Sequence, residues 1–210
     1  PSISALPEHA GDVKRCAEWC GDEMRRIGMQ NVRLIDTPGN PVVYGDWLNA
    51  AGAPTILFYG HYDVQPVDPL DQWASPPFEA TVRDGEIYAR GAADDKGQIF
   101  MHFKAIEAYM QKQGRLPVNI KFMLEGEEEI GSSHLDEFVR SHRRELAADV
   151  VVISDASDDG TDEIVRRAVV LSAAGADIID IGCQPDTPFP HLEETVRALK
   201  SAGYRVSVDS

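Results

Sequence analysis

Hydrophobic runs bounded by glycine, proline and acidic turns divide the chain into alternating strands and helices. Apolar residues recur every three to four positions along residues 8–27, 95–113 and 132–144, which predicts three amphipathic helices. Shorter apolar runs predict strands at residues 31–35, 41–48, 54–60, 118–124 and 149–154. Asp84-Gly85 separates two further short runs and predicts a hairpin.

This alternation predicts an α/β fold: a three-layer, mostly parallel sheet with helices on both faces. The pattern changes near Ser157, where a polar turn at 158–162 is expected. Beyond it, a helix that ends near Ala174 is expected, followed by a strand at 177–181, a helix at 191–202 and a strand at 204–208. We therefore expect a first domain at residues 1–157 and an appended βαβ-like fragment at residues 158–210.

Composition narrows the classes of partner. The chain has 210 residues, 43% of them hydrophobic, and a net charge of −15. This charge argues against nucleic acid or an anionic membrane as the main partner, and no apolar run approaches the roughly 20 residues of a membrane span. Three cysteines do not indicate a disulfide framework. Cys16 and Cys20 lie four positions apart on one face of a predicted helix. They could bind a metal as a pair or be two buried thiols. Because no signal peptide is recognisable, the expected location is cytoplasmic.

One histidine and several carboxylates follow the predicted strands. His61 and Asp63 come directly after the strand at 54–60, and side chains two positions apart in a strand point to the same side. Asp94-Asp95, the run 127–129 and Asp155 also follow apolar runs. Each motif alone has a plain structural explanation: a satisfied polar histidine, a helix cap or a solvated acidic turn. Together, these oxygen and nitrogen donors at strand ends favour a site for two divalent cations.

Four segments carry a resemblance to a known family. They are GHYDVQP at 60–66, YARGAADDKG at 88–97, EGEEEIGS at 125–132 and ISD at 153–155. In order and spacing they resemble the co-catalytic zinc metallopeptidases, which include carnosinase, glutamate carboxypeptidase, aminoacylase and succinyl-diaminopimelate desuccinylase. The resemblance covers about residues 1–156, so the first domain is expected to be an incomplete catalytic domain of this family. HYDVQP, the loop around Trp73 and EGEEEIGS place it nearest to the dipeptidase branch.

The resemblance implies a metal role for four residues. His61, Asp94 and Asp155 would bind one zinc, and Asp94 would bridge to a second zinc that Glu129 also binds. The implied cofactor is therefore a pair of Zn²⁺ ions, for which Mn²⁺ or Co²⁺ could substitute. The family's further zinc-binding histidine and its lid domain have no match, and His191 lies in a different context.

Two further residues receive catalytic roles by resemblance. Asp63 would hold the His61 ring, and Glu128 would be the general base that takes a proton from water. The implied function is a dinuclear zinc-dependent hydrolase that cleaves the amide bond of a dipeptide or N-acyl amino acid and is impaired by truncation. Its partner would be a small peptide or acylated amino acid, and the resemblance allows a homodimer of the intact protein.

The tail resembles a second family. AGADIIDIG at 174–182 and VSVDS at 206–210 are similar to the opening strands of pterin-binding barrels of the dihydropteroate synthase type, where Asp209 would face the pterin. Two alternative functions therefore stay open: a pterin-binding transferase-like protein, and a non-catalytic metal-binding α/β domain. In our primary interpretation, residues 163–210 contribute nothing to the zinc site.

Overall fold

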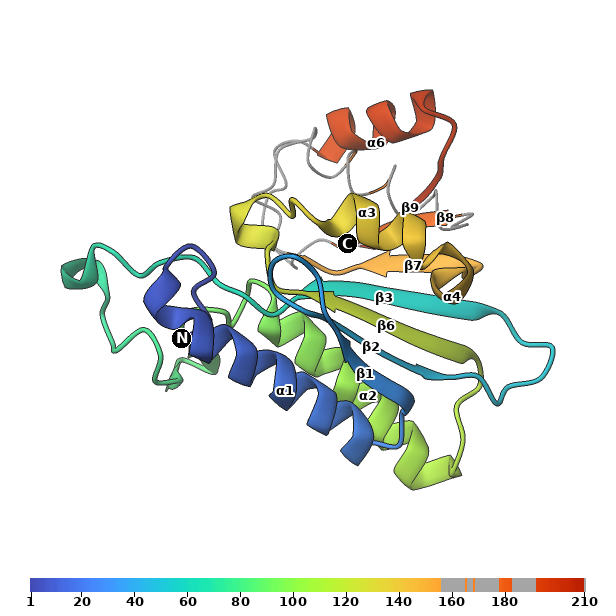
Figure 1. Ribbon diagram of the computed structural model, residues 1–210, viewed down its shortest axis with the longest axis horizontal. Helices are drawn as coiled ribbons and strands as arrows, with labels where there is room; N and C mark the ends of the chain where they lie inside the picture. The colour runs from blue at the N-terminus through green and yellow to red at the C-terminus, as the bar shows by residue number, and fades with distance from the viewer. Residues whose placement is uncertain (156–164, 166–167, 169–177, 183–191, 210) are drawn as a thin grey trace.

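Seven strands form one central sheet in the computed structural model, which describes residues 1–155, 165, 168, 178–182 and 192–209. Their order is β1-β2-β6-β3-β7-β8-β9 (Figure 1). The strands span β1 Gln30–Ile35, β2 Val42–Trp47, β3 Thr55–His61, β6 Asn119–Glu125, β7 Val150–Ile153, β8 Ile178–Gly182 and β9 Arg205–Asp209. β1, β2 and β6 pair antiparallel, whereas β6, β3, β7, β8 and β9 run parallel. The expected mostly parallel sheet is confirmed.

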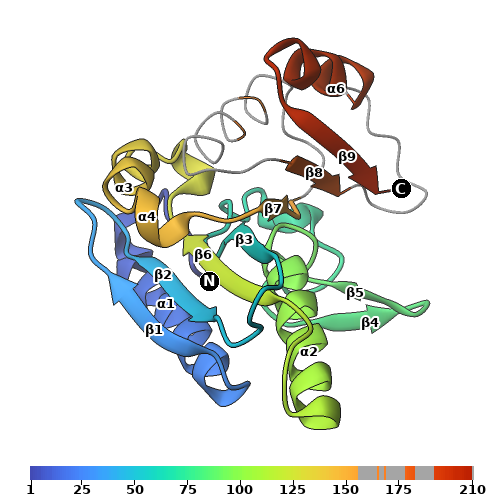
Figure 2. The same ribbon diagram turned by 90° about the vertical axis from the view of Figure 1, so that its right-hand side faces the viewer.

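Helices cover both faces of the sheet, as expected for three layers (Figures 1 and 2). α1 (Ala10–Arg26) and α2 (Lys96–Gln113) lie on one face; α3 (Leu135–Ser141), α4 (Arg143–Leu146) and α6 (Leu192–Ser201) lie on the other. Met24 and Phe103 pack with Phe122 in the core under α1 and α2. Phe138 and Leu199 pack with other sheet residues in the second core. Each large apolar side chain buried in this way contributes about 1.5–3 kcal/mol, so the two cores hold the sheet between its helices.

Local structure departs from the expectation in one helix. The helix predicted at 132–144 is two short helices, α3 and α4, which meet at His142. The backbone of His142 leaves helical geometry with φ −103° and ψ 15°, and its ring nitrogen Nδ1 lies 2.9 Å from the Phe138 carbonyl oxygen. This contact to the last turn of α3 marks the break between the helices.

The predicted hairpin is present as β4 (Thr81–Arg83) and β5 (Glu86–Tyr88), which form a separate two-stranded sheet (Figure 2). Its turn residues Asp84 and Gly85 have φ of +52° and +88°. Positive φ at both central positions is the geometry that an Asp-Gly hairpin turn requires.

The tail strands join the main sheet. β8 pairs with β7 in parallel, and β9 pairs with β8 in the same direction. The expected strand–helix–strand order is therefore found as β8, α6 and β9. The boundary at 157–158, the polar turn at 158–162, most of the helix expected to end near Ala174, His191 and the side chain of Asp209 lie outside what the structure describes. The division into two domains stays a prediction.

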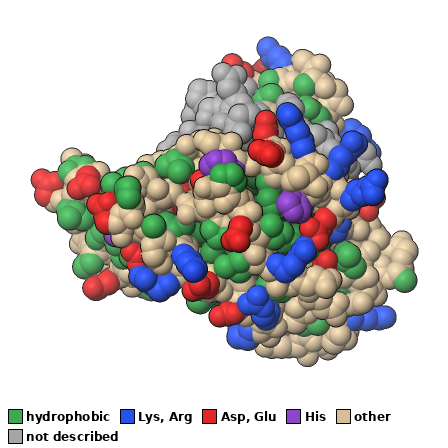
Figure 3. Space-filling view, viewed as in Figure 1, with side chains coloured by type: hydrophobic (Ala, Val, Ile, Leu, Met, Phe, Trp, Pro, Cys, Tyr) green, Lys and Arg blue, Asp and Glu red, His purple; other side chains and the backbone are tan. Residues whose placement is uncertain are grey.

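Charged side chains of both signs are interspersed over the face seen in Figure 3. Arg26 of α1 contacts Glu23 and also reaches Glu107 of α2, with 2.5 Å between nitrogen and oxygen in both pairs. Lys104 lies 2.8 Å from the same Glu107. Of these pairs, Arg26–Glu107 links α1 to α2, and the other two lie within one helix. Among the described residues, none of the helices combines the length and apolar character needed to cross a bilayer.

Candidate metal centre

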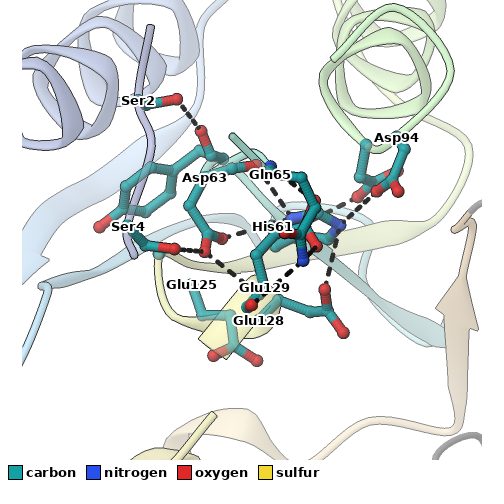
Figure 4. Close-up of polar contacts among 12 residues, drawn as sticks. Ser2, Ser4, His61, Asp63, Gln65, Asp94, Glu125, Glu128 and Glu129 are labelled. Carbon is teal, nitrogen blue, oxygen red and sulfur yellow. Dashed lines mark hydrogen bonds and ion pairs between the residues drawn. The ribbon is translucent and has the colours of Figure 1, made fainter. Parts of the chain in front are cut away.

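The predicted site residues meet where three neighbouring parallel strands end. His61 is the last residue of β3, and Asp155 lies just after β7. Glu128 and Glu129 lie in the 3₁₀ turn Glu128–Ile130, which follows β6. Asp94 comes shortly before α2 (Figure 4). Because β6, β3 and β7 are adjacent and parallel, their carboxyl ends bring these side chains to one edge of the sheet.

The His61 ring is the centre of this cluster. Its Nε2 lies 2.9 Å from Asp94 Oδ1, 3.4 Å from Asp155 Oδ1 and 3.7 Å from Glu128 Oε2. Candidate ligand atoms of His61, Asp94 and Glu129 lie within 4.8 Å of one another. The structure thus brings together the four predicted ligands and Glu128.

Asp63 lies on the other side of the imidazole. Its side chain is completely buried, and its Oδ1 is 3.3 Å from His61 Nδ1, while its backbone carbonyl is 3.2 Å from the same nitrogen. Burial lowers the pKa of His61, but hydrogen bonds to Asp155, Asp63 and Asp94 outweigh it, so the pKa lies well above its ordinary value. The contact at Nδ1 directs Nε2 towards the carboxylates, as in metal sites whose imidazole is oriented by a carboxylate or carbonyl.

Asp95 is a residue of the cluster for which the sequence suggested a helix cap but no part in the metal site. It is fully buried, and its Oδ2 accepts the backbone N–H of His61 at 3.0 Å. It stands at the N-cap of α2 but makes no side-chain capping bond, so the helix-cap explanation is wrong for Asp95. The carboxylate also requires glycine at position 60, where a Cβ would lie 2.5 Å from Asp95 Oδ2. The signal in the sequence was the pair of adjacent aspartates itself.

Asp95 also completes a second group of donors. Ligand atoms of His61, Asp95 and Asp155 lie within 4.8 Å of one another. Burial is the main cause that raises the pKa of Asp95 well above its usual range, and Asp155 and Asp94 add to it. Its Oδ1 has no hydrogen-bond partner among the described residues. Several carboxylates around one imidazole form an oxygen and nitrogen donor set that a divalent cation fits and neutralises.

The three consecutive glutamates do not share one direction. The Oε2 of Glu127 lies 2.7 Å from His134 Nδ1, and its Oε1 accepts the backbone N–H of Asn40 at 3.4 Å. With a relative exposure of 8%, Glu127 is a buried residue and not part of a solvated turn. Of the three, only Glu128 and Glu129 therefore belong to the cluster around His61.

Glu125, to which the sequence assigned no role, stabilises the 3₁₀ turn that carries Glu128 and Glu129. It is buried, and its Oε1 accepts the Tyr59 hydroxyl at 2.5 Å and the Ser132 hydroxyl at 3.0 Å. These bonds connect the end of β6 with Ser132, two residues beyond the 3₁₀ turn, and with β3. They tie together the two ends of the segment that carries Glu128 and Glu129.

Glu129 has its own set of partners. Its backbone N–H donates to Asp63 Oδ2 at 3.2 Å, and both of its carboxylate oxygens accept hydrogen bonds from Gln65. Burial raises the pKa of Glu129, the neighbouring Asp94 raises it further, and the bond from Gln65 opposes this. The side chain is therefore held beside Asp94 by residues that directly follow β3.

His102 of α2 lies behind the cluster and yields a prediction on stability. Its Nε2 is 3.0 Å from Ser154 Oγ, its ring centre is 4.4 Å from that of Phe58, and burial lowers its pKa to about 4. An unfolded histidine titrates near pH 6.5, so below that pH the unfolded chain binds the proton more readily. The metal-free protein should lose up to about 3 kcal/mol of stability from this residue between pH 6.5 and 4.

Urea unfolding at pH 7, 5 and 4 in the presence of a chelator measures this loss. In His102→Gln, which keeps a polar side chain towards Ser154, the decrease in the free energy of unfolding should be smaller by a corresponding amount. An equal decrease in the variant and the parent would contradict the assignment to His102.

Comparisons with known proteins agree with this arrangement. The model of Peptidase family M20/M25/M40 matches residues 57–209. The Beta-Ala-His dipeptidase of Rattus norvegicus is 33% identical over 168 residues, which cover 73% of this chain and 34% of that protein. The Cysteinylglycine-S-conjugate dipeptidase of Corynebacterium striatum is 34% identical over 155 residues, with 73% and 34% covered. The crystal structure of human carnosine dipeptidase 1 is similar with a TM-score of 0.69 and 35% identity, over 73% of this chain and 35% of that one.

The chain thus spans about a third of the length of these relatives. The family match also extends over the tail to residue 209, and the comparisons give no support to a pterin-binding barrel there. The resemblance to zinc metallopeptidases is confirmed: the chain belongs to peptidase family M20/M25/M40.

Proposed function

We propose that this chain carries the metal centre of a dinuclear zinc-dependent hydrolase that cleaves the amide bond of a dipeptide or an N-acyl amino acid. The observation that carries the proposal is the cluster of carboxylates around His61 Nε2, with Asp94 at 2.9 Å and Asp155 at 3.4 Å. The relatives named as dipeptidases support the substrate class. A cytoplasmic location and a homodimer of the intact protein stay predictions.

Four residues are proposed to hold the metals. His61, Asp94 and Asp155 would bind one zinc, and Asp94 and Glu129 would bind the other. Buried Asp95 would help to hold His61, a ligand of the first zinc, by accepting the hydrogen bond from its backbone N–H. When bound, the zinc pair would act as a Lewis acid towards the scissile carbonyl.

Glu128 is proposed as the general base. It belongs to neither of the two donor groups around His61, although its Oε2 lies 3.7 Å from His61 Nε2. Its side chain is only 9% exposed, which keeps the carboxylate at the cluster and away from bulk water. From this position it would accept a proton from the attacking water and return it to the leaving amine.

Asp63 is proposed as a positioning residue. Its Oδ1 lies beside His61 Nδ1, and its Oδ2 accepts hydrogen bonds from Ser4 Oγ at 2.6 Å and from the backbone N–H of Glu129. One buried carboxylate thereby connects a ligand of each zinc. It would keep the ring of His61 and the backbone of Glu129 at a fixed distance from each other.

Calorimetric titration of Zn²⁺ into the metal-free chain tests the proposal. We expect two zinc ions per chain with unequal affinities, because the first has three candidate protein ligands and the second has two among the described residues. Turnover is then followed on β-alanyl-histidine and cysteinyl-glycine with zinc present. A chain that binds no zinc would refute the proposed centre. Zinc binding without turnover of either peptide would support a non-catalytic metal domain instead.

A further inference from the structure

Gln65 makes more contacts with Glu129 than any role considered so far explains. Its backbone N–H donates to Glu129 Oε1 at 3.1 Å, and its side-chain Nε2 donates to Oε2 at 2.7 Å (Figure 4). The same Nε2 lies 3.2 Å from the backbone carbonyl of Glu129. Both carboxylate oxygens and the carbonyl of one candidate ligand are thus engaged by a single residue.

We propose that Gln65 is a positioning residue that presents the Glu129 carboxylate to the second zinc, the one shared by Asp94 and Glu129. This inference rests on the proposed function, since it assigns a partner to a ligand of that centre. A metal-binding carboxylate is usually oriented by hydrogen bonds from groups that do not touch the metal, and such partners affect affinity about 10–100-fold.

The chemistry of the amide suits this task. An ionised carboxylate has about four lone-pair positions, so two bonds from Gln65 leave others for a cation. The amide is a neutral donor. It fixes the plane of the carboxylate without bringing a positive charge that would repel zinc, as an arginine or lysine at position 65 would.

The backbone around Gln65 is held firmly enough to serve as an anchor. On one side, Val64 donates its N–H to the Ser2 carbonyl at 3.0 Å. On the other side, the carbonyl of Pro66 accepts from the Arg90 guanidinium at 2.9 Å, and that of Val67 accepts from Trp73 Nε1 at 2.8 Å. These hydrogen bonds fix the backbone on both sides of Gln65, and the fixed backbone in turn limits where its exposed side chain can reach.

Replacement of the amide tests the proposal. Gln65→Met keeps an unbranched side chain of similar length but removes the donor, while the backbone bond to Oε1 survives. One of the two donors to the carboxylate remains. We therefore expect the affinity for the second zinc to fall about 10-fold, the low end of the 10–100-fold effect of such hydrogen-bond partners. The first zinc should bind as in the parent. Calorimetric titration of metal-free protein with Zn²⁺ resolves the two affinities.

A matched control is available on α2. Gln111 is also exposed and donates its Nε2 to the Glu107 carboxylate at 3.3 Å, away from the centre. Gln111→Met should titrate like the parent, and both variants should unfold at the parent's temperature when metal-free. Glu129→Ala completes the set, because it should remove the second zinc altogether.

The outcomes separate two failures. If Glu129→Ala loses the second zinc but Gln65→Met binds both zincs like the parent, the role of Gln65 is wrong and the proposed function stands. If Gln65→Met weakens both zincs equally or lowers the unfolding temperature, the residue has a general structural role and the inference also fails. If the parent binds no second zinc, both the dinuclear proposal and the role of Gln65 are overturned.

Discussion

Glu128→Gln should reduce turnover of a dipeptide by a factor of about 10²–10⁴ or more, the contribution of a general base, while the tight zinc remains bound. The amide is almost the same size as the carboxylate but cannot accept a proton at neutral pH. Because Glu128 lies outside both donor groups around His61, its replacement should leave the affinity for the tight zinc unchanged. Steady-state rates with saturating zinc and calorimetric titration of the same variant measure the two effects.

The neighbouring Glu127 is the natural control. It has the same side chain one residue earlier, but it lies beside His134 and faces away from the cluster. Glu127→Gln keeps an oxygen for that contact and should retain turnover close to that of the parent. If Glu128→Gln loses the tight zinc together with activity, Glu128 is a ligand and not the base. If it keeps normal turnover, the proton must be taken by another group.

The sequence could predict most of the elements because their signals are local. Periodicity along residues 8–27 and 95–113 and the short apolar runs correspond to α1, α2 and the strands of the sheet. The order of the strands was less accessible, since β6 inserts between β2 and β3, which precede it in the chain. Such non-local pairing leaves no trace in a single strand's pattern.

The tail illustrates the same limit. A strand–helix–strand pattern with short connections is common to barrels and to open parallel sheets, so residues 178–209 could be compared with either. What separates the two is the neighbour of β8, and in this structure that neighbour is β7 of the main sheet. Local pattern therefore predicted β8, α6 and β9 but not the architecture to which they belong.

The site shows which side chains a motif can and cannot predict. His61, Glu129 and Asp155 follow β3, β6 and β7, which become neighbours, so their convergence could be expected from the rule that parallel strand ends meet at one edge. Asp94 follows the separate hairpin of β4 and β5, so that rule does not predict its place in the cluster. The directions of adjacent side chains could not be expected. Glu127 turns towards His134, whereas Asp95 turns back to the His61 backbone, and both depend on contacts far away in the chain.

Asp155→Ala should remove the tight zinc. Asp155 Oδ1 lies 3.4 Å from His61 Nε2, and Asp155 shares a donor group with His61 and Asp95. Its loss leaves the tight zinc with two of its three proposed ligands, His61 and Asp94. Loss of a direct ligand should weaken binding by more than the 10–100-fold typical of outer partners. Calorimetric titration should then find no site with the parent's higher affinity, and peptide turnover should disappear with it.

Asp149 provides a control at the opposite end of β7. Its Oδ2 accepts the backbone N–H of Thr55 at 2.7 Å, far along the strand from the cluster. Asp149→Ala should cost about 1 kcal/mol of stability through that lost bond but retain both zinc affinities. Two equally tight zincs in the parent, or an unchanged tight zinc in Asp155→Ala, would contradict the assignment. The paired variants therefore distinguish a ligand at the end of β7 from an aspartate that only supports the strand.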